Sequence, residues 1–213
     1  MTDIRAVAWD IDGTMLDSEP LHHRALVAVS GRYGVDIALD DDRFVGVGMD
    51  HVWIALQARY PAELTQSLWM DAIVQAYLAD AASLAIYDGL MDTVQALHRN
   101  GIVQCCVSNS ARAIVDANIA RLGIADLIAF SISRDDVTHP KPDPEPYAQA
   151  CQRIGLAPAS VLCFEDSTSG SRSAIAAGCQ LLRYGTDFSV YADLPTHALL
   201  MEPLSRSRTE TLP

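Results

Sequence analysis

The chain has 213 residues, half of them apolar and a fifth charged, which suits one large core or a core with a smaller inserted domain. Its formal net charge of -12 would repel nucleic acid and anionic membranes, so we expect neither as a partner. The five cysteines form no C-x-x-C pair, which argues against a zinc site or a disulfide framework. Without a signal-like start or a long apolar run, the sequence predicts a cytoplasmic protein, and we expect a monomer.

The amino-terminal part of the chain predicts one strand followed by helices. Residues 4–9 form an apolar run that suits a buried strand. No convincing strand interrupts the next stretch, which predicts helices over residues 21–33, 51–60 and 62–84. We therefore interpret residues 19–84 as a helical domain inserted into a second domain made of residues 1–18 and 85–213.

The rest of the chain alternates between helices and short apolar segments. Helix-like segments end at a glycine followed by an apolar residue, at Gly101, Gly123, Gly155 and Gly178. The apolar segments 102–107, 127–132, 161–164 and 181–184 are too short for core helices and suit buried parallel strands. This alternation predicts a doubly wound, Rossmann-like α/β sheet, whereas the end of the chain, 205–213, is expected to be loose.

Acidic residues follow the first strand directly. Asp10 and Asp12 come just past residue 9, and Gly13 permits an unusual turn beside them. Ligands of open α/β sheets bind at the carboxyl ends of the strands, so these carboxylates lie where a site is expected. Taken alone, the motif could equally be an ordinary Asp-Gly turn.

Two further polar segments follow later strands. Ser108, Asn109 and Ser110 precede a predicted helix over residues 111–122 and could bind an anion, or simply cap the helix. Glu165 and Asp166 place two more acids at the end of the strand 161–164.

Lys141 is the only lysine in the chain, which otherwise uses 14 arginines. Pro140 and Pro142 flank it and stiffen the loop around a single cation. An ammonium is a compact point charge, whereas a guanidinium is a planar fork. A site that needs a point charge among carboxylates would select lysine, so we interpret Lys141 as functional.

Taken in the order of the sequence, these polar segments and the Lys141 loop resemble the four motifs of the haloacid dehalogenase superfamily. The matching residues are Asp10-x-Asp12-Gly13-Thr14, Ser108-Asn109, Lys141-Pro142 and Glu165-Asp166-Ser167-x-x-Gly170. Residues 17–21 are similar to the entry into the small helical cap of the phosphoglycolate phosphatase and β-phosphoglucomutase-like branch. The predicted helices up to residue 84 match that cap in position and length.

The resemblance implies a Mg²⁺-dependent phosphatase that acts on a small phosphorylated metabolite. Asp10 would be the nucleophile, Asp12 the general acid and base, and Lys141 the cation that neutralises Asp10. Asp10, the backbone carbonyl of Asp12, Asp166 and, directly or indirectly, Glu165 would hold the metal. Gly13, Thr14, Ser108 and Asn109 would bind the phosphoryl group.

Two other functions stay open at this level. His22 resembles the hinge histidine of the hexose-phosphate mutases, but those enzymes place cations where this chain has Val45 and Met49, around Gly46. A non-catalytic phosphate-binding module would be expected to lose Asp10 or Asp12, and both are present. Arg43 is the nearest remaining cap cation. Phosphoglycolate and sugar phosphates both remain compatible substrates.

Overall fold

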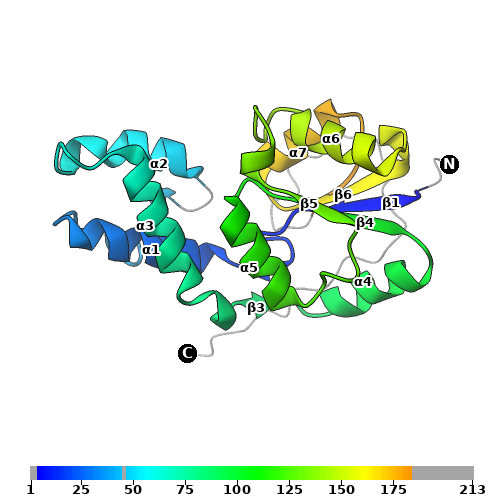
Figure 1. The fold of residues 1–213 in the computed structure, drawn as a ribbon, viewed down its shortest axis with the longest axis horizontal. Helices are drawn as coiled ribbons and strands as arrows, with labels where there is room; N and C mark the ends of the chain where they lie inside the picture. Colours follow the sequence, from blue (N-terminus) through cyan, green and yellow to red (C-terminus); the bar gives the residue numbers. More distant parts are fainter. Residues whose placement is uncertain (1–3, 45–46, 184–213) are drawn as a thin grey trace.

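A computed structural model describes residues 4–44 and 47–183 (Figure 1). Five parallel strands form the central sheet in the order β5-β4-β1-β6-β7. Their bounds are Ala6–Trp9 for β1, Val103–Val107 for β4, Phe130–Ile132 for β5, Val161–Glu165 for β6 and Gln180–Arg183 for β7. Strand β1 lies at the centre, because it pairs with both β4 and β6.

Helices cover both faces of this sheet (Figure 1). They are α4 (Leu90–Arg99), α5 (Arg112–Leu122), α6 (Glu145–Ile154) and α7 (Thr168–Ala176). Successive side chains of a strand point to opposite faces, and β1 uses both. Val7 and Trp9 join the larger hydrophobic cluster with α4 and α5, whereas Ala6 and Ala8 join a second cluster with α6 and α7. The strand is therefore buried on both sides, as an apolar run predicts.

A separate group of helices lies beyond the carboxyl ends of the strands, at the left of Figure 1. It contains α1 (Glu19–Arg32), α2 (Met49–Leu56) and α3 (Gln66–Leu78), and we refer to these three helices as the cap. The chain enters the cap through β2 (Leu16–Asp17) and leaves it through β3 (Ala85–Ile86). The two segments pair as a short antiparallel ribbon, so both connections run side by side.

Contacts between the cap and the sheet domain bring the cap against α5. Helix α3 packs on α1 and on α5, and Tyr77 of α3 donates a hydrogen bond to Asn118 of α5. Asp50 of α2 pairs with Arg134, which follows β5. The division into a cap at residues 19–84 and a core stays a prediction in its boundaries.

The predicted fold class is confirmed: the sheet is parallel, doubly wound and covered by helices on both faces. The four glycines predicted to close helix-like segments take positive φ angles, namely Gly101, Gly123, Gly155 and Gly178, and so does Gly34 after α1. Two helices were predicted to extend too far. The one expected over 51–60 ends as α2 at Leu56 and is followed by a 3-10 turn at Gln57–Arg59. The run expected over 62–84 begins as α3 only at Gln66 and ends at Leu78. The Thr65 side chain caps its start, and a separate 3-10 turn at Ala81–Ser83 follows its end.

Two expected segments lie outside the described residues: Tyr184 at the end of the last predicted strand, and residues 205–213. Within residues 4–44 and 47–183, no helix has both the length and the apolar character needed to span a bilayer.

Candidate active site

The carboxyl ends of the central strands bring the predicted site residues together. Asp10 directly follows β1, Ser108 follows β4, and Glu165 is the last residue of β6. Lys141 reaches the same place from the loop between β5 and α6. The strands are parallel and β1 lies between β4 and β6, so residues separated by up to about 150 positions of sequence meet at the carboxyl ends of the strands.

Lys141 forms the centre of this arrangement. Its ammonium Nζ lies 2.8 Å from Asp10 Oδ1, 2.6 Å from Glu165 Oε1 and 2.7 Å from the Val107 carbonyl oxygen. These three acceptors match the three protons of an ammonium group. Burial would lower the pKa of Lys141, but Asp10 and Glu165 outweigh burial and raise it, so the side chain stays charged.

The second oxygen of Asp10 is also held. The Thr14 hydroxyl lies 2.9 Å from Asp10 Oδ2 and 3.3 Å from Asp166 Oδ1, so it bridges the two carboxylates. Gly13 makes this approach possible, because a Cβ atom at that position would lie 2.1 Å from Asp166 Oδ2. Its φ of 77° is also one that other residues rarely adopt.

Glu165 lies fully buried beneath the start of α7. Oε1 accepts hydrogen bonds from Lys141 and, at 2.5 Å, from the Tyr147 hydroxyl, while Oε2 accepts one from Ser167 at 3.1 Å. A Cβ atom on Gly170 would lie 2.0 Å from this carboxylate, so the glycine of the fourth motif provides room for it. Every oxygen of Glu165 therefore has a protein partner.

Asp12 has a different environment from Asp10. Its carboxylate accepts hydrogen bonds from five side chains: Ser18 at 2.8 Å, Ser110 at 2.8 Å, Ser108 at 3.0 Å, Asn118 at 3.1 Å and His22 at 3.4 Å. Burial alone would raise the pKa of Asp12, but the bonds from His22, Ser110 and Ser18 prevail and hold it well below its usual range. The same contact with Asp12 raises the pKa of His22 against the effect of its burial.

The remaining carboxylates crowd one another. Burial and the charge of Glu165 raise the pKa of Asp10 well above its usual value, and Lys141 offsets this only in part. Burial and Glu165 likewise raise the pKa of Asp166 to about 6. Asp10, Glu165 and Asp166 each offer an oxygen within 4.8 Å of the others. Oxygen donors with this excess of negative charge fit a hard divalent cation such as Mg²⁺.

Asn109 contacts the loop that bears Lys141. Its amide nitrogen donates to the Lys141 carbonyl at 3.0 Å, and its amide oxygen accepts from the Lys141 backbone N–H at 2.9 Å. The side chain thus fixes the lysine loop against the end of β4. Its predicted role in phosphoryl binding stays a prediction.

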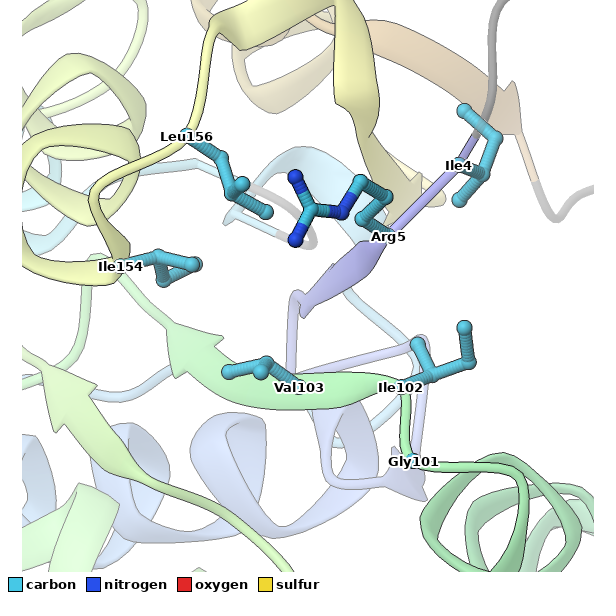
Figure 2. Close-up of a pocket in the computed structure, with 7 residues that line it drawn as sticks. All are labelled: Ile4, Arg5, Gly101, Ile102, Val103, Ile154 and Leu156. Carbon is cyan, nitrogen blue, oxygen red and sulfur yellow. The ribbon is translucent and has the colours of Figure 1, made fainter.

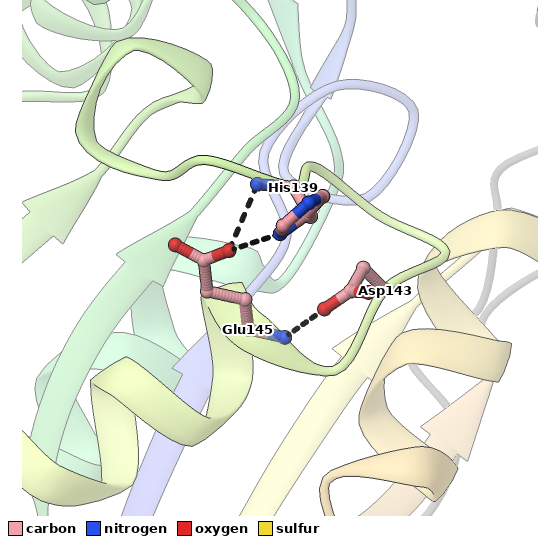
Figure 3. Close-up of side chains that lie close together, drawn as sticks. All are labelled: His139, Asp143 and Glu145. Carbon is pink, nitrogen blue, oxygen red and sulfur yellow. Dashed lines mark hydrogen bonds and ion pairs between the residues drawn. The ribbon is translucent and has the colours of Figure 1, made fainter.

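Another cluster, His139, Asp143 and Glu145, flanks the same loop (Figure 3). Glu145 accepts hydrogen bonds from the backbone N–H groups of Thr138 and His139, both at 2.8 Å, and contacts the His139 ring at 3.0 Å. Asp143 accepts from the Glu145 backbone N–H at 2.9 Å. These bonds close the loop around Lys141, which accounts for the cluster without a bound ion.

A cavity of about 340 Å³ lies at the opposite ends of the strands (Figure 2). Ile4 and Arg5 precede β1, and Gly101, Ile102 and Val103 border the start of β4. Ile154 and Leu156 complete its lining. It contains none of the residues of the candidate site.

Sequence reasoning missed two residues that the structure adds to the site, Asn118 and Tyr147. It named Ser18, Ser110 and Ser167 but not their contacts with Asp12 and Glu165. One of the two missed residues carried a readable signal. Asn118 lies on the same helix face as Ile114, Val115 and Leu122, all buried. An amide on an apolar helix face is buried at a cost unless it is hydrogen-bonded, and Asn118 therefore indicated a polar partner.

The family follows from comparison with known proteins. Residues 4–178 match the family model described as haloacid dehalogenase-like hydrolase. The chain belongs to this family, as its four motifs predicted.

Individual relatives share most of their length with this chain. It is 32% identical over 184 residues to a phosphoglycolate phosphatase of Thiobacillus denitrificans, covering 83% of this chain and 81% of that protein. It is also 32% identical over 178 residues to the fructose-1-phosphate phosphatase YqaB of Escherichia coli, covering 80% and 90%. A crystal structure of CbbY from Rhodobacter sphaeroides in complex with phosphate has the same fold, with a TM-score of 0.75, 24% identity and 86% and 87% coverage.

Proposed function

We propose that the protein is a Mg²⁺-dependent phosphatase that hydrolyses a small phosphorylated metabolite through a phospho-aspartyl intermediate at Asp10. The observation that carries this proposal is the fixed placement of the Asp10 carboxylate. Lys141 binds one of its oxygens at 2.8 Å and Thr14 binds the other at 2.9 Å. A nucleophile held in this way needs little reorganisation before it attacks.

The proposed reaction has two displacements. In the first, an oxygen of Asp10 attacks phosphorus, the bond from phosphorus to the leaving oxygen breaks, and Asp12 gives that oxygen its proton. In the second, water attacks the phosphorus of the acyl phosphate, Asp12 takes the proton of the water, and phosphate leaves with Asp10 restored. Lys141 stays protonated throughout and offsets the charge around Asp10.

The five donors around Asp12 favour its carboxylate form, which suits the second displacement. The first displacement requires a protonated Asp12, which donates its proton to the leaving oxygen. Ser18 and His22 lie at the entry to the cap, in the loop before α1 and in α1 itself. Displacement of the cap between turnovers would withdraw these two donors and allow Asp12 to be protonated.

A magnesium ion fits the residues present. Asp10 and Asp166 would hold it together with the backbone carbonyl of Asp12, and Glu165 would support the site from beneath. The hydrogen bonds to both Glu165 oxygens favour this indirect role. When bound, the ion would supply positive charge to the phosphoryl oxygens and offset the repulsion that raises the pKa of Asp10 and Asp166.

The substrate class is proposed from the relatives, which act on phosphoglycolate and on a sugar phosphate by name. A small phosphorylated metabolite is therefore the proposed partner of the site. The cytoplasmic location and the monomeric state stay predictions from the sequence.

An assay against a panel of phosphorylated metabolites tests the proposal. With millimolar Mg²⁺ we expect release of inorganic phosphate from at least one of them, loss of activity in excess chelator, and recovery when Mg²⁺ is restored. Ca²⁺ should inhibit, because its looser coordination allows a bidentate carboxylate and would occupy Asp10. Mg²⁺ should also raise the melting temperature, since it relieves carboxylate repulsion. Full activity in chelator would contradict the metal assignment, and no hydrolysis anywhere on the panel would favour a phosphate-binding module.

A second assay separates hydrolysis from the mutase alternative. Val45 and Gly46 lie outside the described residues, and Met49 opens α2 with its side chain packed against the main hydrophobic cluster. An apolar Met49 offers no charge for a second phosphate. We expect β-glucose 1-phosphate, incubated with its 1,6-bisphosphate, to yield inorganic phosphate or nothing. Net formation of glucose 6-phosphate would establish a mutase instead.

A further inference from the structure

Two buried side chains, linked by a hydrogen bond, connect the cap to Asp12. The Tyr77 hydroxyl, from α3, donates to Asn118 Oδ1 at 2.9 Å, and Asn118 Nδ2, from α5, donates to Asp12 Oδ1 at 3.1 Å. Tyr77 and Asn118 are both fully buried. The hydrogen bonds therefore run from the cap, through the helix that follows β4, to a carboxylate at the end of β1.

The direction of these bonds is fixed by chemistry. Burial and the charge of Asp12 raise the pKa of Tyr77, so its phenol keeps its proton and acts as a donor. Asn118 then accepts with its oxygen and must present its amino group to Asp12, whose carboxylate accepts only. The Asp12 carboxylate therefore requires this orientation of the Asn118 amide, and Tyr77 stabilises it by donating to the amide oxygen.

The Tyr77 ring also contacts the other cap residue that reaches Asp12. Its centroid lies 4.5 Å from that of the His22 imidazole, and His22 Nε2 lies 3.4 Å from Asp12 Oδ1. Oδ1 of Asp12 therefore has three partners, Ser18, Asn118 and His22, and the last two of these contact Tyr77. Within the described residues, this is where α3 reaches the acid and base of the proposed reaction.

We propose that Tyr77 and Asn118 are positioning residues that orient the carboxylate of Asp12 for proton transfer when the cap lies against α5. This inference rests on the proposed function, because it assigns Asp12 the role of acid and base. Neither residue touches the reacting atoms. Each acts through Asp12, so their loss should impair proton transfer more than phosphoryl transfer itself.

The alternative is that the pair only satisfies buried polar groups at the interface between cap and core. Leaving-group dependence separates the two possibilities. Phenolate is a much poorer leaving group than p-nitrophenolate and depends more on a proton from Asp12. The ratio kcat/KM covers the steps up to departure of the leaving group, so comparing phenyl phosphate with p-nitrophenyl phosphate isolates the acid step.

Tyr77→Phe is the first variant, because it removes one hydroxyl and keeps the ring. We expect kcat/KM for phenyl phosphate to fall about tenfold and that for p-nitrophenyl phosphate to fall about twofold or less, since general acid catalysis contributes about a hundredfold or more in total. Tyr60→Phe is the matched control. Tyr60 is also a buried cap tyrosine, but its hydroxyl contacts Ser30 and Trp69 within the cap only. It should leave the ratio between the two substrates unchanged.

Asn118→Leu and the double variant Tyr77→Phe/Asn118→Leu test whether Tyr77 acts on Asp12 through Asn118. Because Tyr77 acts through Asn118, the double variant should be no worse than Asn118→Leu alone, which should itself lose at least as much on phenyl phosphate as Tyr77→Phe. Melting temperatures of all variants identify any that fail to fold, in which case Tyr77→Phe alone decides.

Equal losses on both substrates, or no loss, in Tyr77→Phe would overturn the inference and leave a purely structural role. Additive losses in the double variant would overturn the coupling through Asn118. These outcomes differ from failure of the proposed function itself, in which the unmodified protein would hydrolyse neither aryl phosphate with Mg²⁺ present.

Discussion

Asp10→Asn should lose at least about a thousandfold in kcat, the scale of loss expected when a covalent nucleophile is removed. The amide keeps the shape of the side chain and can still accept from Lys141, but it cannot form the acyl phosphate. The fold should survive, because burial and the neighbouring Glu165 make the Asp10 charge unfavourable, and Lys141 keeps Glu165 as its ion-pair partner when that charge is removed. A melting curve beside the kinetic assay checks both expectations.

Asp126→Asn is the matched control for this change. Asp126 is exposed and lies between α5 and β5, at the edge of the sheet opposite the candidate site. It should keep full activity and stability. If Asp10→Asn retained more than about a hundredth of the wild-type turnover, Asp10 could not be the nucleophile.

Lys141→Arg should cost about a hundredfold to a thousandfold in kcat/KM, the range typical of losing a preorganised charge at a transition state. The Lys141 side chain is 2% exposed, and its ammonium has three acceptors between 2.6 and 2.8 Å. A guanidinium is wider and spreads its charge over a plane, so it cannot occupy this position without displacing Asp10 or Glu165.

Lys141→Ala should be similarly inactive and also less stable, because breaking a buried ion pair by removing one partner typically costs about 3 to 5 kcal/mol. The comparison between the two variants separates charge from fit. Lys141→Arg keeps the charge, so a large kinetic loss with a smaller loss of stability would identify geometry as the cause.

Arg24→Lys provides the control in the reverse direction. Arg24 pairs with Asp80 at 3.3 Å on the exposed surface of the cap, where either cation can serve. It should be close to wild type in both activity and melting temperature. If Lys141→Arg kept more than about half of the wild-type kcat/KM, equivalent to about 0.4 kcal/mol, the single lysine would be an accident of composition.

The sequence predicted the residues of the site better than their contacts. Asp10, Asp12, Lys141, Glu165 and Asp166 were found from their places after strands and from the spacing of four motifs. The signal of each motif is local in the sequence, because a strand ends, a polar residue follows, and a short loop holds that residue. Such signals can be read without knowing which strands are neighbours.

The partners of Asp12 could not be predicted in the same way. Ser18 precedes α1 and Asn118 lies on α5, so neither is next to Asp12 in the sequence. The contact between Asn118 and Tyr77 depends on how α3 packs against α5. The boundaries of the cap helices were also imprecise, since the start and end of α3 are fixed by the Thr65 cap and the turn after Leu78.

The sequence by itself therefore determined the doubly wound sheet, the family and the acids and lysine at the strand ends. These depend on periodicity and on motifs that lie close together in the chain. Only the tertiary structure decided that Lys141 lies between Asp10 and Glu165, and that Asp12 is held by five donors from the core and the cap. Hydrogen bonds act over about 3 Å, so they depend on the packing of distant segments, which no local pattern encodes.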